Sequence, residues 1–88
     1  MASSNEGSAK NIDWDDVIKK EARGINDVDF GEVQLIMGYI VITEKGIVNK
    51  DRFYLSKSLV DKFDVYKLWF KITQDEAHSR YRNIEQIL

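Results

Sequence analysis

The chain has no cysteine among its 88 residues, which excludes disulfide bonds, thiolate metal sites and cysteine nucleophiles. It also lacks any apolar run approaching the roughly 18 residues that cross a bilayer as a helix. Residues 1–11 are rich in Ser, Asn and Gly and contain no apolar run, which predicts a flexible tail and not a secretory signal. We therefore expect a cytoplasmic protein that does not insert into a membrane.

Side chains suited to catalysis are scarce. His78 is the single histidine, and no Gly-x-Ser-x-Gly turn accompanies it. The five glycines are dispersed, so no glycine-rich loop leads into a helix as a phosphate site requires. The sequence thus predicts a protein that is not an enzyme and that holds no cofactor.

The acidic stretch near the start invites comparison with a calcium site. Asp13, Asp15 and Asp16 provide carboxylates at the spacing that opens an EF-hand loop. Counted from Asp13, however, the sixth position is Ile18 where that loop has glycine, and the twelfth is Gly24 where it has glutamate. Helix capping by Asp13 explains the acids better, and we expect no metal site.

Hydrophobic residues are plentiful, at 43% of the chain with ten aromatics, and the length suits one domain. The net charge of −2 gives no global attraction to nucleic acid. Its distribution is uneven, because residues 43–71 hold seven Lys/Arg against four Asp/Glu. No DNA partner is expected, and RNA or the ribosome is a weaker candidate than a protein partner.

Alternating apolar residues predict a series of short strands. Val33, Leu35 and Met37 fall on one expected face, and Gly38 suits a tight hairpin before residues 39–43. That second strand is apolar on both faces, which predicts a central strand covered on both sides. Further strands are expected at residues 47–55 and 65–72, with residues 56–64 forming a turn whose Leu59, Val60 and Phe63 plug one end of a barrel. In the last strand the inward residues by alternation are Tyr66, Leu68, Phe70 and Ile72.

A helix signature follows the last strand. Thr73 and Glu76 form a predicted capping box, and the apolar stripe that follows comprises Ala77, Tyr81, Ile84 and Leu88. The predicted organisation is a tail over 1–11, a domain over 12–73 and an amphipathic helix over 74–88. The predicted fold is mainly β, a small antiparallel barrel of five to six strands closed by a C-terminal α-helix.

The stretch "VYKLWFKI" carries the most suggestive surface. Lys67, Trp69 and Lys71 share one face of the expected strand, and Arg52 is a candidate neighbour, together with Lys45, Lys50 and Lys57. Aromatics interleaved with cations suit a docking surface for a protein or for single-stranded nucleic acid. The alternative is structural: the C-terminal helix covers Trp69, and the lysines keep their charged ends in water.

The helix stripe offers a second candidate surface, with Tyr81 as a candidate contact. It packs either on its own barrel, on a partner, or on a second copy of the chain. A homodimer through this helix or through an exposed strand edge is therefore one alternative.

Five short segments occur in a characteristic order: Asp29-Phe30-Gly31-Glu32-Val33, Tyr54-Leu55, Leu59-Val60-Asp61, Leu68 to Ile72 and Thr73-Gln74-Asp75-Glu76-Ala77. Their order resembles that of the PRC-barrel family, named for the photosynthetic reaction centre. The resemblance covers roughly residues 17–77. Within the family, the chain resembles most the stand-alone proteins common in archaea. It departs at Ser56, where members often have proline, and this chain has no proline.

The resemblance implies a non-catalytic barrel used for docking. Family members form the cytoplasmic part of the reaction-centre H subunit and a domain of the ribosome maturation factor that docks on the small subunit. Archaeal stand-alone versions include cell-division scaffold proteins. The expected function is therefore a protein-interaction adaptor, with RNA or ribosome association in RNA maturation as the alternative.

Overall fold

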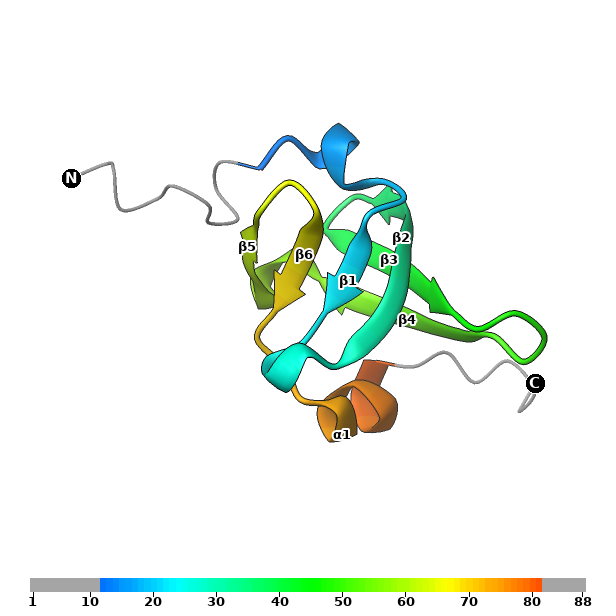
Figure 1. Ribbon diagram of the computed structural model, residues 1–88. Helices are drawn as coiled ribbons and strands as arrows, with labels where there is room; N and C mark the ends of the chain where they lie inside the picture. Colours follow the sequence, from blue (N-terminus) through cyan, green and yellow to red (C-terminus); the bar gives the residue numbers. More distant parts are fainter. Residues whose placement is uncertain (1–11, 82–88) are drawn as a thin grey trace.

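The computed structural model describes residues 12–81 (Figure 1). The tail predicted for residues 1–11 lies outside this range. The described elements, in chain order, are a 3-10 turn Trp14–Val17, β1 Glu21–Arg23, a turn Ile25–Asp27, β2 Asp29–Met37, β3 Ile40–Lys45, β4 Asp51–Ser56, a turn Lys57–Leu59, β5 Val60–Phe63, β6 Lys67–Phe70, and α1 Gln74–Glu76 continuing as a wider helical turn Ala77–Tyr81.

The strands form one six-stranded sheet in the order β4-β3-β2-β1-β6-β5. The prediction of a mainly β protein with a C-terminal helix is confirmed. The predicted all-antiparallel pairing is wrong, because β1 pairs in parallel with β6. The expected closure into a barrel is not found either: within residues 12–81, β4 pairs only with β3 and β5 only with β6. In Figure 1 the sheet bends, with β6 and β1 in front of β3 and β4.

The segment that links β4 to β5 explains why these two edge strands do not pair with each other. Ser56 caps the three-residue turn Lys57–Leu59, since its Oγ accepts a hydrogen bond of 3.1 Å from the Ser58 amide. The chain then enters β5, which joins β6 by a hairpin instead of pairing with β4. Residues 60–63 thus form a strand, and the predicted turn over this segment is wrong. Val60 is buried there, and Leu59 and Phe63 pack partly buried against the core.

Aromatic rings occupy the centre of the core. The Phe30 ring lies 5.3 Å from that of Phe53 and 6.5 Å from that of Phe70, both at tilted angles that aromatic pairs favour. These residues come from β2, β4 and β6, so the cluster joins both halves of the bent sheet. The buried hydrophobic set also includes Val17, Ala22, Val33, Val41, Leu55, Leu68, Ile72 and Ala77.

An irregularity in β2 changes which side chains face inward. Val33 pairs with Thr43, but Leu35 pairs with Ile42, so one β2 residue between them has no separate partner. Leu35 and Met37 are 45% and 56% exposed, whereas Val33 is fully buried. The prediction that these three residues share one face is therefore wrong, because the shift reverses the alternation.

The last strand begins later than expected. Leu68, Phe70 and Ile72 are buried as predicted, but Tyr66 is 76% exposed, so its inward assignment is wrong. Tyr66 belongs to the turn before β6, where Val65 has a φ of +81°. Alternation applies only within the strand, and here it starts at Lys67.

The predicted helix caps are both present. The Thr73 hydroxyl accepts from the Glu76 amide at 3.1 Å, and the Glu76 carboxylate accepts from the Thr73 amide at 3.0 Å. Asp13 likewise accepts from the Asp15 amide at 3.1 Å. Ala77 is buried and Tyr81 is half-buried, whereas Ile84 and Leu88 lie outside the described residues. Within residues 12–81, no helix has the length and apolar character needed to span a membrane.

Candidate docking surface around Trp69

Trp69 lies on the outer face of the sheet because alternation along β6 turns its neighbours Leu68 and Phe70 into the core. It is half-buried. Its register partners are Lys62 on β5 and Arg23 on β1, so the indole has a cationic residue on each adjacent strand. We define the Trp69 surface as Lys62, Asp64, Lys67, Trp69 and Lys71.

Asp64 holds the tryptophan and the turn together. The Trp69 Nε1–H donates to Asp64 Oδ2 at 3.0 Å, and the amides of Tyr66 and Lys67 donate to Oδ1 at 3.0 and 2.7 Å. These bonds stabilise the ionised carboxylate, so the pKa of Asp64 lies below its ordinary value, with the Trp69 hydrogen bond as the largest cause. The orientation of the indole is thereby fixed within the single chain.

We expect the stability of the protein to fall as the pH drops below the ordinary aspartate value of about 3.9, in part through Asp64. The folded state holds Asp64 ionised more strongly than the unfolded chain does, so this stabilisation is complete above the unfolded pKa and disappears as pH falls through the lower folded pKa. Asp64→Asn should lower stability at pH 7 by about 1 kcal/mol, given the exposed site, and flatten the acid limb of a plot of Tm against pH.

The matched control is Asp61→Asn, an exposed residue of the preceding strand β5 that forms no ion pair within residues 12–81. It should leave the acid limb as in the wild type. If Asp64→Asn leaves the acid limb unchanged, the charge of the Asp64 carboxylate contributes nothing to stability beyond the hydrogen bonds that an asparagine side chain can also form.

Two lysines flank the indole ring. The ammonium groups of Lys62 and Lys67 lie 5.9 and 5.8 Å from the ring centroid, within the range of cation–π attraction. At exposed sites such contacts contribute about 0.5–1 kcal/mol each. Lys71 follows on the same face and is exposed, with no ion pair within residues 12–81. Its charge is thus available to a ligand.

An open hollow of about 320 Å³ lies next to the tryptophan. Its walls are residues 24–27 from the turn after β1, residues 61–62 from β5 and residues 69–71 from β6. Its lining combines the indole and aliphatic groups with Asp27, Asp61, Lys62 and Lys71. The hollow suits an apolar side chain with polar groups around it better than a highly charged ligand of one sign.

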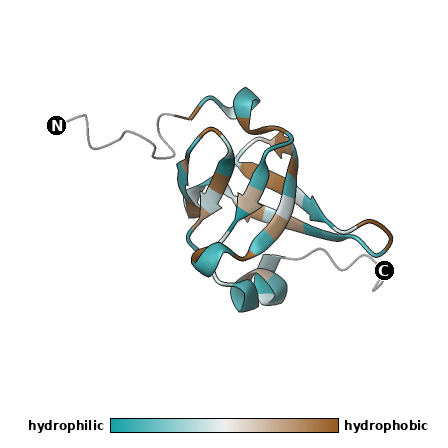
Figure 2. Cartoon of the chain, in the orientation of Figure 1, coloured by the Kyte–Doolittle hydropathy of each residue, from teal (hydrophilic) through white to brown (hydrophobic). Residues whose placement is uncertain are grey.

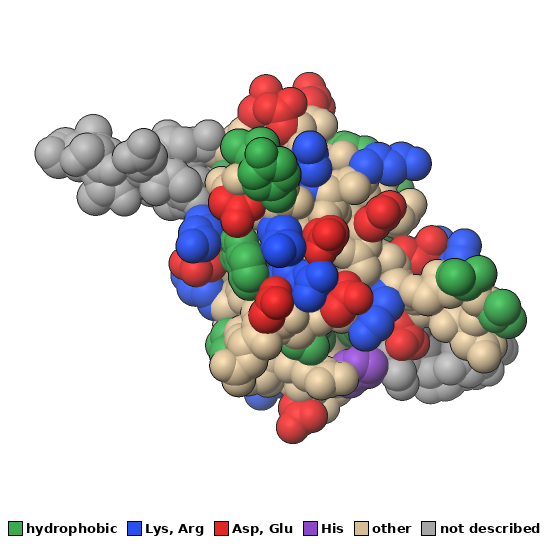
Figure 3. Space-filling view, in the orientation of Figure 1, with side chains coloured by type: hydrophobic (Ala, Val, Ile, Leu, Met, Phe, Trp, Pro, Cys, Tyr) green, Lys and Arg blue, Asp and Glu red, His purple; other side chains and the backbone are tan. Residues whose placement is uncertain are grey.

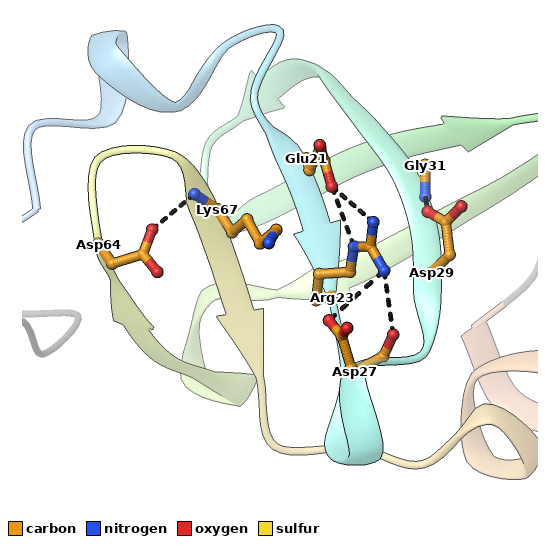
Figure 4. A network of polar contacts seen from close by, with 7 residues as sticks. All are labelled: Glu21, Arg23, Asp27, Asp29, Gly31, Asp64 and Lys67. Carbon is orange, nitrogen blue, oxygen red and sulfur yellow. Dashed lines mark hydrogen bonds and ion pairs between the residues drawn. The ribbon is translucent and has the colours of Figure 1, made fainter.

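Ion pairs occupy the adjoining face of β1. The Arg23 guanidinium contacts the Glu21 carboxylate at 2.6 Å and the Asp27 carboxylate at 3.4 Å, as Figure 4 shows. The hydrogen bond to Glu21 is the largest cause of a raised pKa for Arg23. Figure 3 shows the result on the viewed face, where blue and red side chains alternate instead of gathering by sign.

The structure separates the cations of the basic middle segment. Arg52 contacts Glu44 at 2.8 Å and Lys50 contacts the same carboxylate at 3.6 Å, while Lys57 lies 4.6 Å from the Trp14 ring. Arg52 is on β4, at the other edge of the sheet from the β5–β6 hairpin. The predicted neighbourhood of Arg52 with Lys67, Trp69 and Lys71 is therefore wrong, because sequence proximity does not follow strand order.

The C-terminal turns pack elsewhere than on Trp69. They lie against β4, with the His78 ring 5.3 Å from that of Phe53 and Tyr81 partly buried against the core. Packing of the stripe within the chain, as expected for Ala77, is thus found, but the contacts of Trp69 are with Asp64, Lys62 and Lys67.

Two residues of this surface, Asp64 and Lys62, were not singled out from the sequence. In "FDVYK" an aspartate precedes by two and three residues the amides that bond to it. This spacing is a recognisable signal of an Asx turn. Lys62 could be placed only once β5 was recognised as a strand. Among residues 12–81, no three His, Asp or Glu side chains gather in a way that could hold a metal ion.

Comparison with protein-family models and with curated proteins found no match to the chain.

Proposed function

We propose that the protein is a non-catalytic docking module of the PRC-barrel type, which binds a protein partner through the Trp69 surface. The observation that carries the proposal is the indole held on an outer sheet face by Asp64, beside an open hollow. Tryptophan is enriched among the residues that dominate protein–protein binding energies. An aromatic already fixed in place also loses little side-chain freedom on binding.

The PRC-barrel part of the proposal rests on the segment order quoted above. A bent six-stranded sheet followed by a capped C-terminal turn is compatible with an open variant of such a barrel. By this resemblance the role proposed is that of an adaptor in a cytoplasmic assembly, such as a cell-division scaffold.

The test is binding of partners by matched variants. Trp69→Ala should weaken a genuine partner by roughly 30-fold, the loss of about 2 kcal/mol typical of a central aromatic contact. Lys71→Glu should weaken it less, and Lys45→Glu, with the same charge change outside the surface, should not. Each variant is checked for unchanged thermal unfolding, and affinities are measured by calorimetry with the purified partner.

Association with RNA is the competing function, because Trp69 carries two lysines over its ring. If the protein binds RNA, ribonuclease should release the bound material. The double variant Lys67→Glu with Lys71→Glu should abolish binding, and the affinity should fall steeply as the salt concentration rises. Binding that survives ribonuclease and moderate salt but is lost in Trp69→Ala supports the protein-docking function. Equal binding by wild type and Trp69→Ala overturns it.

A further inference from the structure

The outer face of β2, β3 and β4 is apolar. Residues paired across neighbouring strands point to the same side of a sheet. Leu35, Ile42 and Tyr54 form one such row, and Met37, Ile40 and Ser56 form the next. The intervening residues Val41 and Leu55 are fully buried in the core, so both rows face away from it. We call Leu35, Met37, Ile40, Ile42 and Tyr54 the β3 outer face.

This face is open at its flanks in the single chain, whereas its central residue Ile42 is only 4% exposed. Leu35 and Met37 are 45% and 56% exposed, Ile40 and Tyr54 are half-buried, and Tyr39 in the adjoining hairpin turn is 61% exposed. Figure 2 shows hydrophobic colour on β2 and β3 toward the hairpin that joins them. Antiparallel sheets with one solvated face normally carry polar residues there. An apolar face of three adjacent strands is the arrangement found where a second layer packs.

A row of charged residues borders the two apolar rows. Its charges indicate which partner surface can pack on the β3 outer face. Glu32, Glu44 and Arg52 are paired across β2, β3 and β4, so they lie in line on the same outer face. Glu44 is already neutralised by Arg52 at 2.8 Å and Lys50 at 3.6 Å, and its pKa is lowered chiefly by the Arg52 hydrogen bond. Glu32 is exposed and has no ion pair within residues 12–81. The row is thus acidic at its β2 end and basic at its β4 end.

We propose that the β3 outer face binds the same face of a second copy of this chain, related by a twofold axis parallel to β3. This rotation places β2 over the β4 of the second copy while each row stays over itself. Glu32 then faces the partner's Arg52, Leu35 faces the partner's Tyr54, and Ile42 faces the partner's Ile42. An acid at one end of the row and a base at the other make the row complementary to its own rotated copy.

The resulting dimer is a two-layer sandwich with aligned sheets about 10 Å apart. Its apolar rows remove Leu35, Met37 and Ile40 from water around Ile42, which is already buried in the single chain, and its charged border excludes other registers. The interface uses β2, β3 and β4, whereas the Trp69 surface is built on the β5–β6 hairpin. The dimer therefore presents two Trp69 surfaces, and its existence does not depend on the proposed docking function.

The experiment is sedimentation equilibrium of the full chain from about 1 µM to about 1 mM, the range in which a modest interface dissociates. The wild type should change from monomer to dimer. Met37→Glu, which places a charge in the apolar row beside Ile40, should raise the dimer Kd at least about tenfold. Val48→Glu makes a comparable change at an 87% exposed residue of the β3–β4 loop, outside the face, and should leave the Kd unchanged.

Charge exchange tests the twofold arrangement itself. Glu32→Arg and Arg52→Glu should each weaken the homodimer, because the first opposes two cations and the second two anions. In a mixture of the two variants both contacts become attractive, so heterodimers should form in preference to either homodimer, as native mass spectrometry can count. Trp69→Ala should dimerise like the wild type, which separates this result from any failure of the docking function.

Several outcomes overturn the proposal. A wild type that stays monomeric at about 1 mM does so, as does a dimer that Met37→Glu leaves intact. A chain ending at Tyr81 that dimerises where the full chain does not would assign the β3 outer face to residues 82–88 of the same molecule.

Discussion

Gly31→Ala is expected to remove most of the stability of the domain. Gly31 has a φ of +89°, a conformation that disfavours any side chain, and a β-carbon built there would overlap the carbonyl of Glu44 on the neighbouring strand. The added β-carbon belongs to the backbone of β2 and meets backbone atoms of β3, so no side chain can move away to remove the overlap. The two strands must separate instead. We expect a loss of more than about 3 kcal/mol, measured by urea unfolding, or no cooperative unfolding at all.

Gly38→Ala is the matched control. Gly38 also has a positive φ, of +58°, but an added β-carbon there meets no atom within 4 Å. Only the intrinsic cost of the left-handed conformation remains, about 1–2 kcal/mol. Equal effects of the two substitutions would show that the close approach of β2 to β3 does not constrain the fold.

Phe53→Ala is expected to cost about 3–5 kcal/mol, the range for removing a buried aromatic ring. Phe53 is fully buried, and its ring lies 5.3 Å from those of Phe30 and His78. It therefore joins the core to the C-terminal turn as well as to β2. Urea unfolding should show the loss, and trypsin should cut faster after Arg80 because the turn loses its packing partner.

Val48→Ala serves as the control for this substitution. Val48 is 87% exposed in the loop between β3 and β4, so its truncation should change stability by less than about 0.5 kcal/mol. If Phe53→Ala destabilised the core but left cleavage after Arg80 unchanged, the C-terminal turn would be held by contacts other than the His78–Phe53 pair.

The predictions that succeeded rest on local chemistry. The capping box of Thr73 with Glu76 and the cap by Asp13 need only neighbours in sequence, and both are found. The inward placement of Leu68 and Phe70 follows from alternation within β6, and Ile72, two residues beyond its end, continues the pattern. Such signals identified a mainly β chain with a capped C-terminal helix.

The predictions that failed depend on pairing between distant segments. A single unpaired residue in β2 turns Leu35 and Met37 outward, and no local pattern marks where it occurs. The position of Arg52 relative to Trp69 depends on the strand order, which places β4 and β5 at opposite edges. The Trp69 surface could be predicted in part, as Lys67, Trp69 and Lys71 share a strand face, but Asp64 required the geometry of the turn.

Both apolar faces of β3 were evident from the sequence, and the structure shows that they differ in fate. One face, with Val41 and Thr43, is fully buried, while on the other Ile42 is 4% exposed and Ile40 is half-buried. A strand with two apolar faces indicates two covering layers, and on the outer side Ile40 and the flanking Leu35 and Met37 still have exposed surface. The second layer is the subject of the dimer experiment.

The parallel pairing of β1 with β6 has a consequence for how the chain acquires its structure. β1 is complete on one side as soon as β2 is made, but its other side waits for residues 67–70, which come more than half the chain later. Pairing of such distant segments carries a large loop-closure cost and slows folding. During synthesis the β1–β4 part is therefore made first, and the β5–β6 hairpin, together with the Trp69 surface, is added later, followed by the C-terminal turns.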